Sequence, residues 1–115
     1  MRKSDNHGRL EDMLSAIKRI ESYMRGMKEK QFADDQMRQD AIMLQIEIIG
    51  EAARNISDEF QEQHAAIPWS KIIGMRNKIV HDYFEIDVTR IWDTAKNDIP
   101  QLKKVVVGIL KELKG

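Results

Sequence analysis

The chain has 115 residues, a length typical of one compact domain, and we expect a single domain over residues 1–115. Hydrophobic residues make up 42% and charged residues 33%, a mixture typical of a folded, helix-rich protein. Lysine plus arginine and aspartate plus glutamate number 19 each. The formal net charge is therefore zero, which argues against a protein that coats nucleic acid by charge alone.

Cysteine is absent, which excludes disulfides and thiolate metal sites. No run approaches the roughly 18 apolar residues that a membrane-spanning helix needs. The start "MRKSDNHGRL" also lacks the apolar core of a signal peptide. We therefore expect a cytoplasmic protein that does not enter a membrane.

The first predicted helix runs from about residue 8 to residue 30. Its apolar residues recur at three- and four-residue steps and form one stripe, at Leu10, Met13, Leu14, Ile17, Ile20, Met24 and Met27. The second predicted helix begins at Asp34 or Asp35, because a short carboxylate accepts hydrogen bonds from the free amides of a helix start. It is expected to reach about Phe60.

The second helix carries two apolar stripes. One comprises Met37, Ala41, Leu44, Ile48 and Ala52, and the other comprises Ile42, Ile46, Ile49, Ala53 and Ile56. Two such stripes predict burial on two sides, one in the domain core and one against a partner. Gly50 lies between them, where it can allow a close helix approach at a propensity cost of roughly 1 kcal/mol relative to alanine.

Residues 64–84, "HAAIPWSKIIGMRNKIVHDYF", predict a short third helix with Pro68 in its first turn, where a missing amide is tolerated. Asp87 is the predicted N-cap of the last helix. Its apolar positions keep helical phase through Pro100, which predicts one long helix kinked near that proline. The expected fold is an all-α bundle of three long helices and one short helix.

The stretch "MRNKIVHDYF", residues 75–84, contains the candidate functional residues. At about 100° per residue, His81 lies roughly 140° around the helix from Arg76, whereas Asn77 and His81 share a face. Either the helix unwinds near His81, or a second copy of the chain completes an arginine–histidine pair.

These residue types suit RNA cleavage. Histidine, with an unperturbed pKa of about 6.5, can take and give a proton near neutral pH, and arginine presents a fork of donors to phosphate oxygens. RNA supplies its own nucleophile, the 2′-hydroxyl, so cleavage needs no metal. Spacing alone also fits a solvated or hydrogen-bonded helix end, and this alternative stays open.

The same stretch resembles the R-x4-H-x-Y motif of the HEPN superfamily, and specifically of its HepT-like toxins. Arg76, Asn77, His81 and Tyr83 match all four motif positions. "IEIIGEAARNIS", residues 46–57, resembles the second-helix signature of that group, and "IDVTRIWDTAKNDIPQL" is similar to its last helix. The resemblance covers nearly the whole chain.

The resemblance implies a HEPN-like bundle that dimerises and acts as a metal-independent endoribonuclease without a cofactor. Arg76 would contact phosphate, Asn77 would hold the catalytic groups in position, and His81 would transfer protons. It also implies a toxin of a toxin–antitoxin pair, whose MntA-like minimal nucleotidyltransferase antitoxin attaches AMP to Tyr83. On an uninterrupted helix Tyr83 would lie within roughly 20° of Arg76, so that AMP could obstruct the site.

Two other functions are weighed against this one. The chain could be a non-catalytic HEPN binding module that partners a nucleotidyltransferase, or a purely structural helical dimer. Glu47 and Glu51 share a helix face, but two carboxylates alone make a weak metal site, and we expect none. Arg54 and Asn55 are interpreted as ordinary helix-face residues beside a possible cleft.

Overall fold

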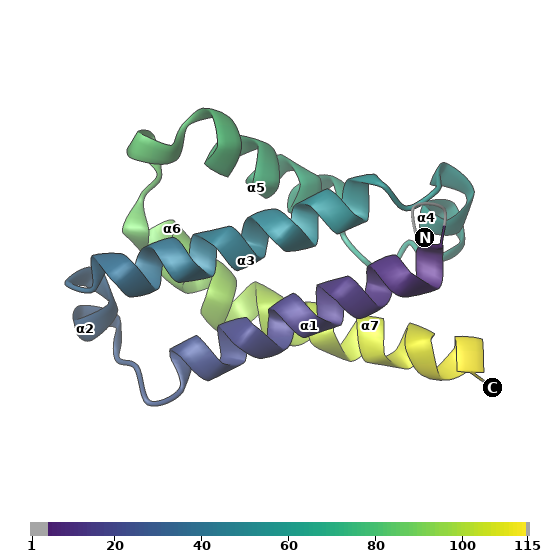
Figure 1. The fold of residues 1–115 in the computed structure, drawn as a ribbon, viewed down its shortest axis with the longest axis horizontal. Coiled ribbons are helices and arrows are strands. Elements are labelled where there is room, and N and C mark those ends of the chain that lie inside the picture. Colours follow the sequence, from purple (N-terminus) through teal and green to yellow (C-terminus); the bar gives the residue numbers. More distant parts are fainter. Residues whose placement is uncertain (1–4, 115) are drawn as a thin grey trace.

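The computed structural model describes residues 5–114, and all regular elements in this range are helical, which confirms the all-α prediction. Figure 1 shows α3 lying between α5 and α1, with α6 and α7 crossing behind them. In chain order the elements are α1 (Asn6–Met24), α2 (Glu29–Ala33), α3 (Gln36–Arg54), α4 (Asp58–Gln63), α5 (Trp69–His81), the 3-10 turn η1 (Tyr83–Glu85), α6 (Val88–Asp93), the π-helical turn η2 (Thr94–Asp98) and α7 (Ile99–Lys114).

The first helix is shorter than predicted. It ends at Met24, and Gly26 follows with a φ of 73°, a left-handed conformation that favours glycine. The chain then turns into α2, whose Phe32 is completely buried. The prediction that the first helix continues to residue 30 is therefore wrong.

The second predicted helix is also divided. Asp35 is its N-cap as predicted, and the carboxylate accepts a hydrogen bond of 3.0 Å from the amide of Arg38. The helix ends at Arg54, and Ser57 starts α4 by accepting a hydrogen bond of 3.3 Å from the amide of Phe60. One helix up to residue 60 was a wrong prediction because a serine hydroxyl competes for helix-start amides at this point.

The two predicted stripes of α3 have different environments. Every member of the second stripe is buried in the core. In the first stripe, Ala52 is buried, whereas Met37, Leu44 and Ile48 are exposed, Met37 by 85%. One side of α3 thus faces the core as predicted, while the assignment of a partner to the other side remains a prediction.

The last helix follows a continuous helical path through Pro100, as predicted, and Asp87 caps it through a 2.9 Å bond from the Thr89 amide. A π-helical turn occupies residues 94–98 directly before the proline. Pro100 has no amide to donate, and its ring crowds the carbonyl four residues earlier. A wider turn at this point accommodates both restrictions.

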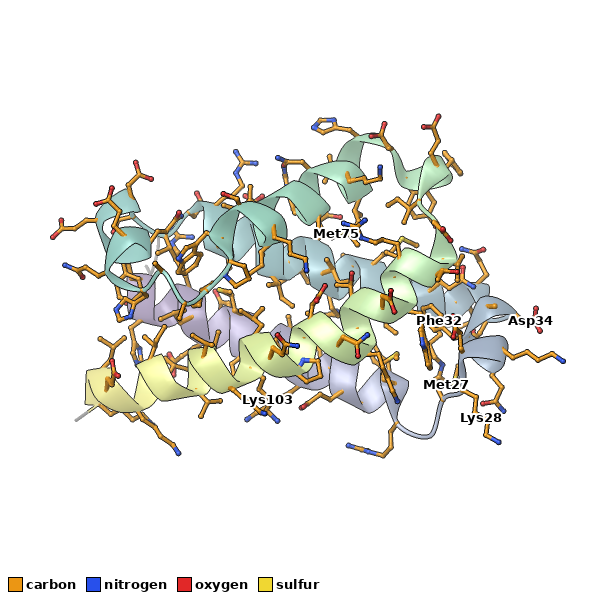
Figure 2. The ribbon with its side chains drawn as sticks, turned by 180° about the vertical axis from the view of Figure 1, so that it is seen from behind. Met27, Lys28, Phe32, Asp34, Met75 and Lys103 are labelled. Atoms are coloured by element: carbon orange, nitrogen blue, oxygen red, sulfur yellow. The ribbon has the colours of Figure 1, made fainter. Side chains whose placement is uncertain are left out.

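The core lies where α1, α3 and α7 meet. Its completely buried side chains include Leu10 and Ile17 of α1, Ile42 of α3 and Val106 of α7. Figure 2 looks at the opposite side, where Lys103 on α7 donates to the Glu21 carboxylate of α1 at 3.0 Å. Across residues 5–114, no helix combines the length and apolar character needed to cross a membrane.

Candidate active site at the crossing of α3 and α5

Gly50 sets the distance between α3 and α5. A Cβ atom at this position would lie 2.1 Å from the Cβ and 2.8 Å from the Cγ of Arg76. No such contact is sterically possible, so only glycine allows the Arg76 stem to lie directly on the α3 backbone. The predicted close approach at Gly50 is confirmed, and its consequence is a firmly held Arg76.

Arg76 is mostly buried, and its guanidinium is bound at two points. The side chain is 16% exposed, and Nη2 lies 3.1 Å from Oε2 of Glu51 on α3. Nη1 donates a 2.9 Å hydrogen bond to Oδ1 of Asn77, while the buried Nε has no hydrogen-bond partner in the described structure. The positively charged fork is thus oriented before any ligand arrives.

Glu51 is a site residue that sequence reasoning missed. Its carboxylate also lies 3.6 Å from Nη1 of Arg54 and accepts a 3.2 Å bond from Nδ2 of Asn55. The Glu51 side chain is 49% exposed, whereas that of Arg76 is 16% exposed, so the carboxylate is the more solvent-accessible member of the pair.

Asn77 contacts Arg76 rather than His81. The expectation that Asn77 and His81 face the same way follows from their spacing, but the Asn77 amide oxygen accepts its bond from Arg76. Within residues 5–114 no hydrogen bond joins Asn77 to His81. Asn77 is therefore arranged to orient the guanidinium.

His81 is the last residue of α5, and its side chain is exposed. The helix does not unwind before it, because the amide of Asp82 still donates a 2.8 Å bond to the carbonyl of Lys78. In the described part of the chain the imidazole has no hydrogen bond or ion pair, and it makes none with Arg76. The structure therefore brings Arg76, Asn77 and Glu51 together but leaves His81 apart from them within one chain.

Tyr83 lies outside the helix that carries Arg76, so the shared face expected on an uninterrupted helix does not form. Helix α5 ends at His81, and Tyr83 begins the 3-10 turn η1. Its hydroxyl donates a hydrogen bond to the carboxylate of Asp40 on α3. This bond to Asp40 is the main cause that raises the pKa of Tyr83 above its ordinary value. The ring is 36% exposed and packs edge-on against Phe84 with centroids 5.0 Å apart.

Exposed apolar side chains lie on α3, on α5 and in the turn η1. We define the α3–α5 apolar face as Met37, Leu44, Ile48, Val80 and Phe84, all of which are exposed, with Phe84 at 96%. Val80 follows Arg76 by four residues in α5, and Ile48 precedes Glu51 by three in α3, so each lies beside its charged neighbour. A face of this kind is typical of an interaction surface.

The cavity between α5 and α7 does not involve the motif residues. Among residues 5–114 no three His, Asp or Glu side chains are grouped so as to hold a metal ion. A cavity of about 340 Å³ lies between α5 and α7 and is lined by residues that include Ile46, Ile72, Met75 and Leu102. The candidate site is therefore taken to be the group of charged residues at the crossing of α3 and α5.

Known proteins resemble the chain over most of its length. The family described as Ribonuclease HepT-like matches residues 13–109. A Thermococcus cleftensis protein named "Probable ribonuclease HepT" is 44% identical over 94 residues, which cover 82% of this chain and 86% of that protein. A Caldanaerobacter subterraneus protein, named as a candidate RNase, is 37% identical over 105 residues, covering 91% and 94%.

A third relative, a Methanocaldococcus jannaschii protein also named as a candidate RNase, is 33% identical over 115 residues, covering 100% of this chain and 95% of its own. No solved structure matches the chain. The chain belongs to the HepT-like ribonuclease family of the HEPN superfamily.

Proposed function

We propose that the protein is a metal-independent endoribonuclease that acts as a homodimer through Arg76 and His81. The family and its RNase-named relatives support an RNA-cleaving enzyme. The observation that carries the proposal is the guanidinium of Arg76, which the exposed Glu51 carboxylate and the Asn77 amide oxygen hold in place.

The proposed reaction uses the 2′-hydroxyl of RNA as the nucleophile. His81 takes the proton of that hydroxyl while its oxygen forms a bond to the adjacent phosphorus. The bond from phosphorus to the 5′-oxygen breaks, and that oxygen receives a proton from the protonated His81 imidazole. The phosphate oxygens displace the Glu51 carboxylate from the Arg76 guanidinium. The guanidinium then stabilises the negative charge that builds up on these oxygens. The products are a 2′,3′-cyclic phosphate and a 5′-hydroxyl.

Purified protein is expected to cleave RNA in the presence of EDTA, because the proposed chemistry uses only protein side chains. The products should carry 2′,3′-cyclic phosphate ends, which gel mobility before and after phosphatase treatment identifies. The control is the same RNA incubated with the His81→Ala protein. Cleavage that EDTA stops would contradict the metal-independent mechanism.

Dimerisation would complete the site that one chain leaves open. Arg76 and His81 point about 140° apart on α5, so a substrate phosphate held by Arg76 needs a histidine from elsewhere. A two-fold contact through the α3–α5 apolar face would cover Leu44 and Phe84 and place both copies of α5 at one interface. Burial of these exposed side chains supplies the driving force.

Leu44→Glu is expected to convert the dimer into a monomer and to remove RNA cleavage, because it puts a charge in the centre of the proposed interface. Light scattering coupled to gel filtration measures the first effect, and the cleavage assay measures the second. Leu113→Glu is the matched control, since Leu113 is similarly exposed, at 46%, but lies on α7. A Leu44→Glu protein that remains dimeric would refute this interface.

Within the proposed function, the protein is the toxin of a pair, and an MntA-like nucleotidyltransferase is its antitoxin, which adds AMP to Tyr83. Tyr83 is 36% exposed, and it stands two residues after His81. AMP would add bulk and negative charge beside the exposed apolar face, where it would oppose both dimer contact and RNA phosphate.

Incubation with an MntA-like nucleotidyltransferase and Mg-ATP is expected to raise the intact mass of the protein by whole AMP units. The Tyr83→Phe protein should gain no mass, because phenylalanine has no oxygen to accept the group. A gain that survives Tyr83→Phe would remove Tyr83 from the proposal, and so would a wild-type protein that gains nothing.

A non-catalytic binding module is the second candidate, and the Glu51 carboxylate on Arg76 favours it, because this pair leaves Arg76 neutralised. Such a module would bind the nucleotidyltransferase without cleaving RNA or slowing growth. Expression of the wild-type and His81→Ala proteins in growing cells separates the two functions. Growth inhibition by the wild type alone supports the nuclease.

A further inference from the structure

Asp40 is the acidic residue that contacts the Tyr83 hydroxyl, although the two lie 43 residues apart in the chain. Asp40 belongs to the first turns of α3, and Tyr83 belongs to the turn η1 after α5. The same carboxylate accepts a 2.9 Å bond from Nε2 of Gln36, which lies one turn earlier on α3. Asp40 is therefore oriented by its own helix and directed at the phenol oxygen.

A tyrosine hydroxyl that attacks phosphorus must lose its proton, so the reaction requires a proton acceptor. A protonated phenol is a weak nucleophile, and the contact with Asp40 raises the pKa of Tyr83. Free phenolate is consequently scarce near neutral pH, and the proton has to leave as the new bond forms. A carboxylate already hydrogen-bonded to the hydroxyl is placed to receive it.

Resting on the proposed modification of Tyr83, we propose that Asp40 is the general base of that reaction. The Tyr83 oxygen forms a bond to the α-phosphorus of ATP, and the Tyr83 proton passes to the Asp40 carboxylate. The bond from that phosphorus to the bridging oxygen breaks, and pyrophosphate leaves with its electron pair. An aspartate that accepts the proton of an attacking hydroxyl serves the same purpose in protein kinases.

The second tyrosine of the chain provides an internal comparison. The chain contains 2 tyrosines, and Tyr23 is half-buried at the end of α1. Within the described residues its hydroxyl contacts no carboxylate, whereas that of Tyr83 contacts Asp40. A reaction that depends on Asp40 should therefore modify Tyr83 and leave Tyr23 unmodified.

The test compares the rate of AMP addition in wild-type, Asp40→Asn and Asp34→Asn proteins, using an MntA-like nucleotidyltransferase, Mg-ATP and intact mass spectrometry. Asparagine keeps an oxygen that accepts the Tyr83 hydrogen bond, but it cannot take up the proton. Asp40→Asn is expected to slow the reaction roughly 10²-fold or more. Asp34→Asn is the control, since Asp34 is an exposed aspartate before the same helix and should keep the wild-type rate.

A difluorotyrosine placed at position 83 separates proton transfer from mere positioning. Its phenol is more acidic, so it should recover much of the rate lost in Asp40→Asn while changing the wild-type rate little. If this rescue is absent, or if wild-type and Asp40→Asn proteins react at equal rates, Asp40 is not the general base. The proposed modification of Tyr83 is not affected by either result. A wild-type protein without mass gain, or with AMP mapped to Tyr23, would overturn the Tyr83 modification together with it.

Discussion

Replacing His81 with alanine is expected to lower RNA cleavage by roughly 10²–10⁴-fold, the usual contribution of a general acid–base group. The fold should not change, because the His81 side chain is exposed at the end of α5 and makes no hydrogen bond in the described structure. Cleavage of a labelled RNA and far-UV circular dichroism measure the two effects. His7→Ala on α1 is the control and should cleave normally, and unchanged cleavage in His81→Ala would end the proposed mechanism.

Mixing two inactive variants tests whether the arginine and the histidine come from different chains. An Arg76→Ala chain still carries His81, and a His81→Ala chain still carries Arg76. Random pairing should give mixed dimers with one complete site, and thus about a quarter of the wild-type activity. Before mixing, each variant should be inactive and should show the wild-type helix content. A mixture as inactive as its components would show that one chain must supply both residues.

Gly50→Ala is expected to cost roughly 1–3 kcal/mol of folding free energy and to reduce cleavage strongly. The new methyl group would meet the Arg76 stem at 2.1 Å, so either α5 must move outward or Arg76 must leave its place. Both responses break the contact between Arg76 and Glu51. Urea denaturation measures the stability, and the cleavage assay measures the displacement of Arg76.

Gly108→Ala is the matched control for this substitution. Gly108 lies inside α7, and a Cβ there would meet no atom within 4 Å. Alanine in an open helix position should stabilise the protein by roughly 0.5–1 kcal/mol and leave cleavage unchanged. A Gly50→Ala protein with normal stability and normal cleavage would show that α3 and α5 do not cross as closely as the contact between Gly50 and Arg76 indicates.

Local signals in the sequence predicted the elements well wherever a short-range interaction decides the structure. Asp35 and Asp87 are N-caps because each bonds an amide two or three residues ahead, a contact visible in the sequence. The buried stripe of α3 follows from helical periodicity. The helix ends at Met24, Arg54 and His81 were not predicted, since the apolar pattern runs on past each of them.

In the candidate site, too, local sequence signals predicted some features and not others. The R-x4-H-x-Y spacing identified Arg76, His81 and Tyr83 as candidates, and helical geometry already indicated that the first two diverge. The sequence by itself therefore determined the helical class, the main caps and the residue types of the candidate site. The sequence did not predict which residues these side chains contact, because the spacing of residues within one helix carries no information about the neighbouring helix.

Only the tertiary structure decided that Gly50 receives the Arg76 stem, that Glu51 holds the guanidinium and that Asp40 takes the Tyr83 hydroxyl. Each of these contacts joins α3 to α5 or to the turn behind it, between residues 25 or more positions apart in the chain, as the 43-residue separation of Asp40 and Tyr83 illustrates. Helical periodicity relates only residues three or four apart. Contacts between residues on different helices depend on the angle and distance at which the helices cross. Packing of the core determines both.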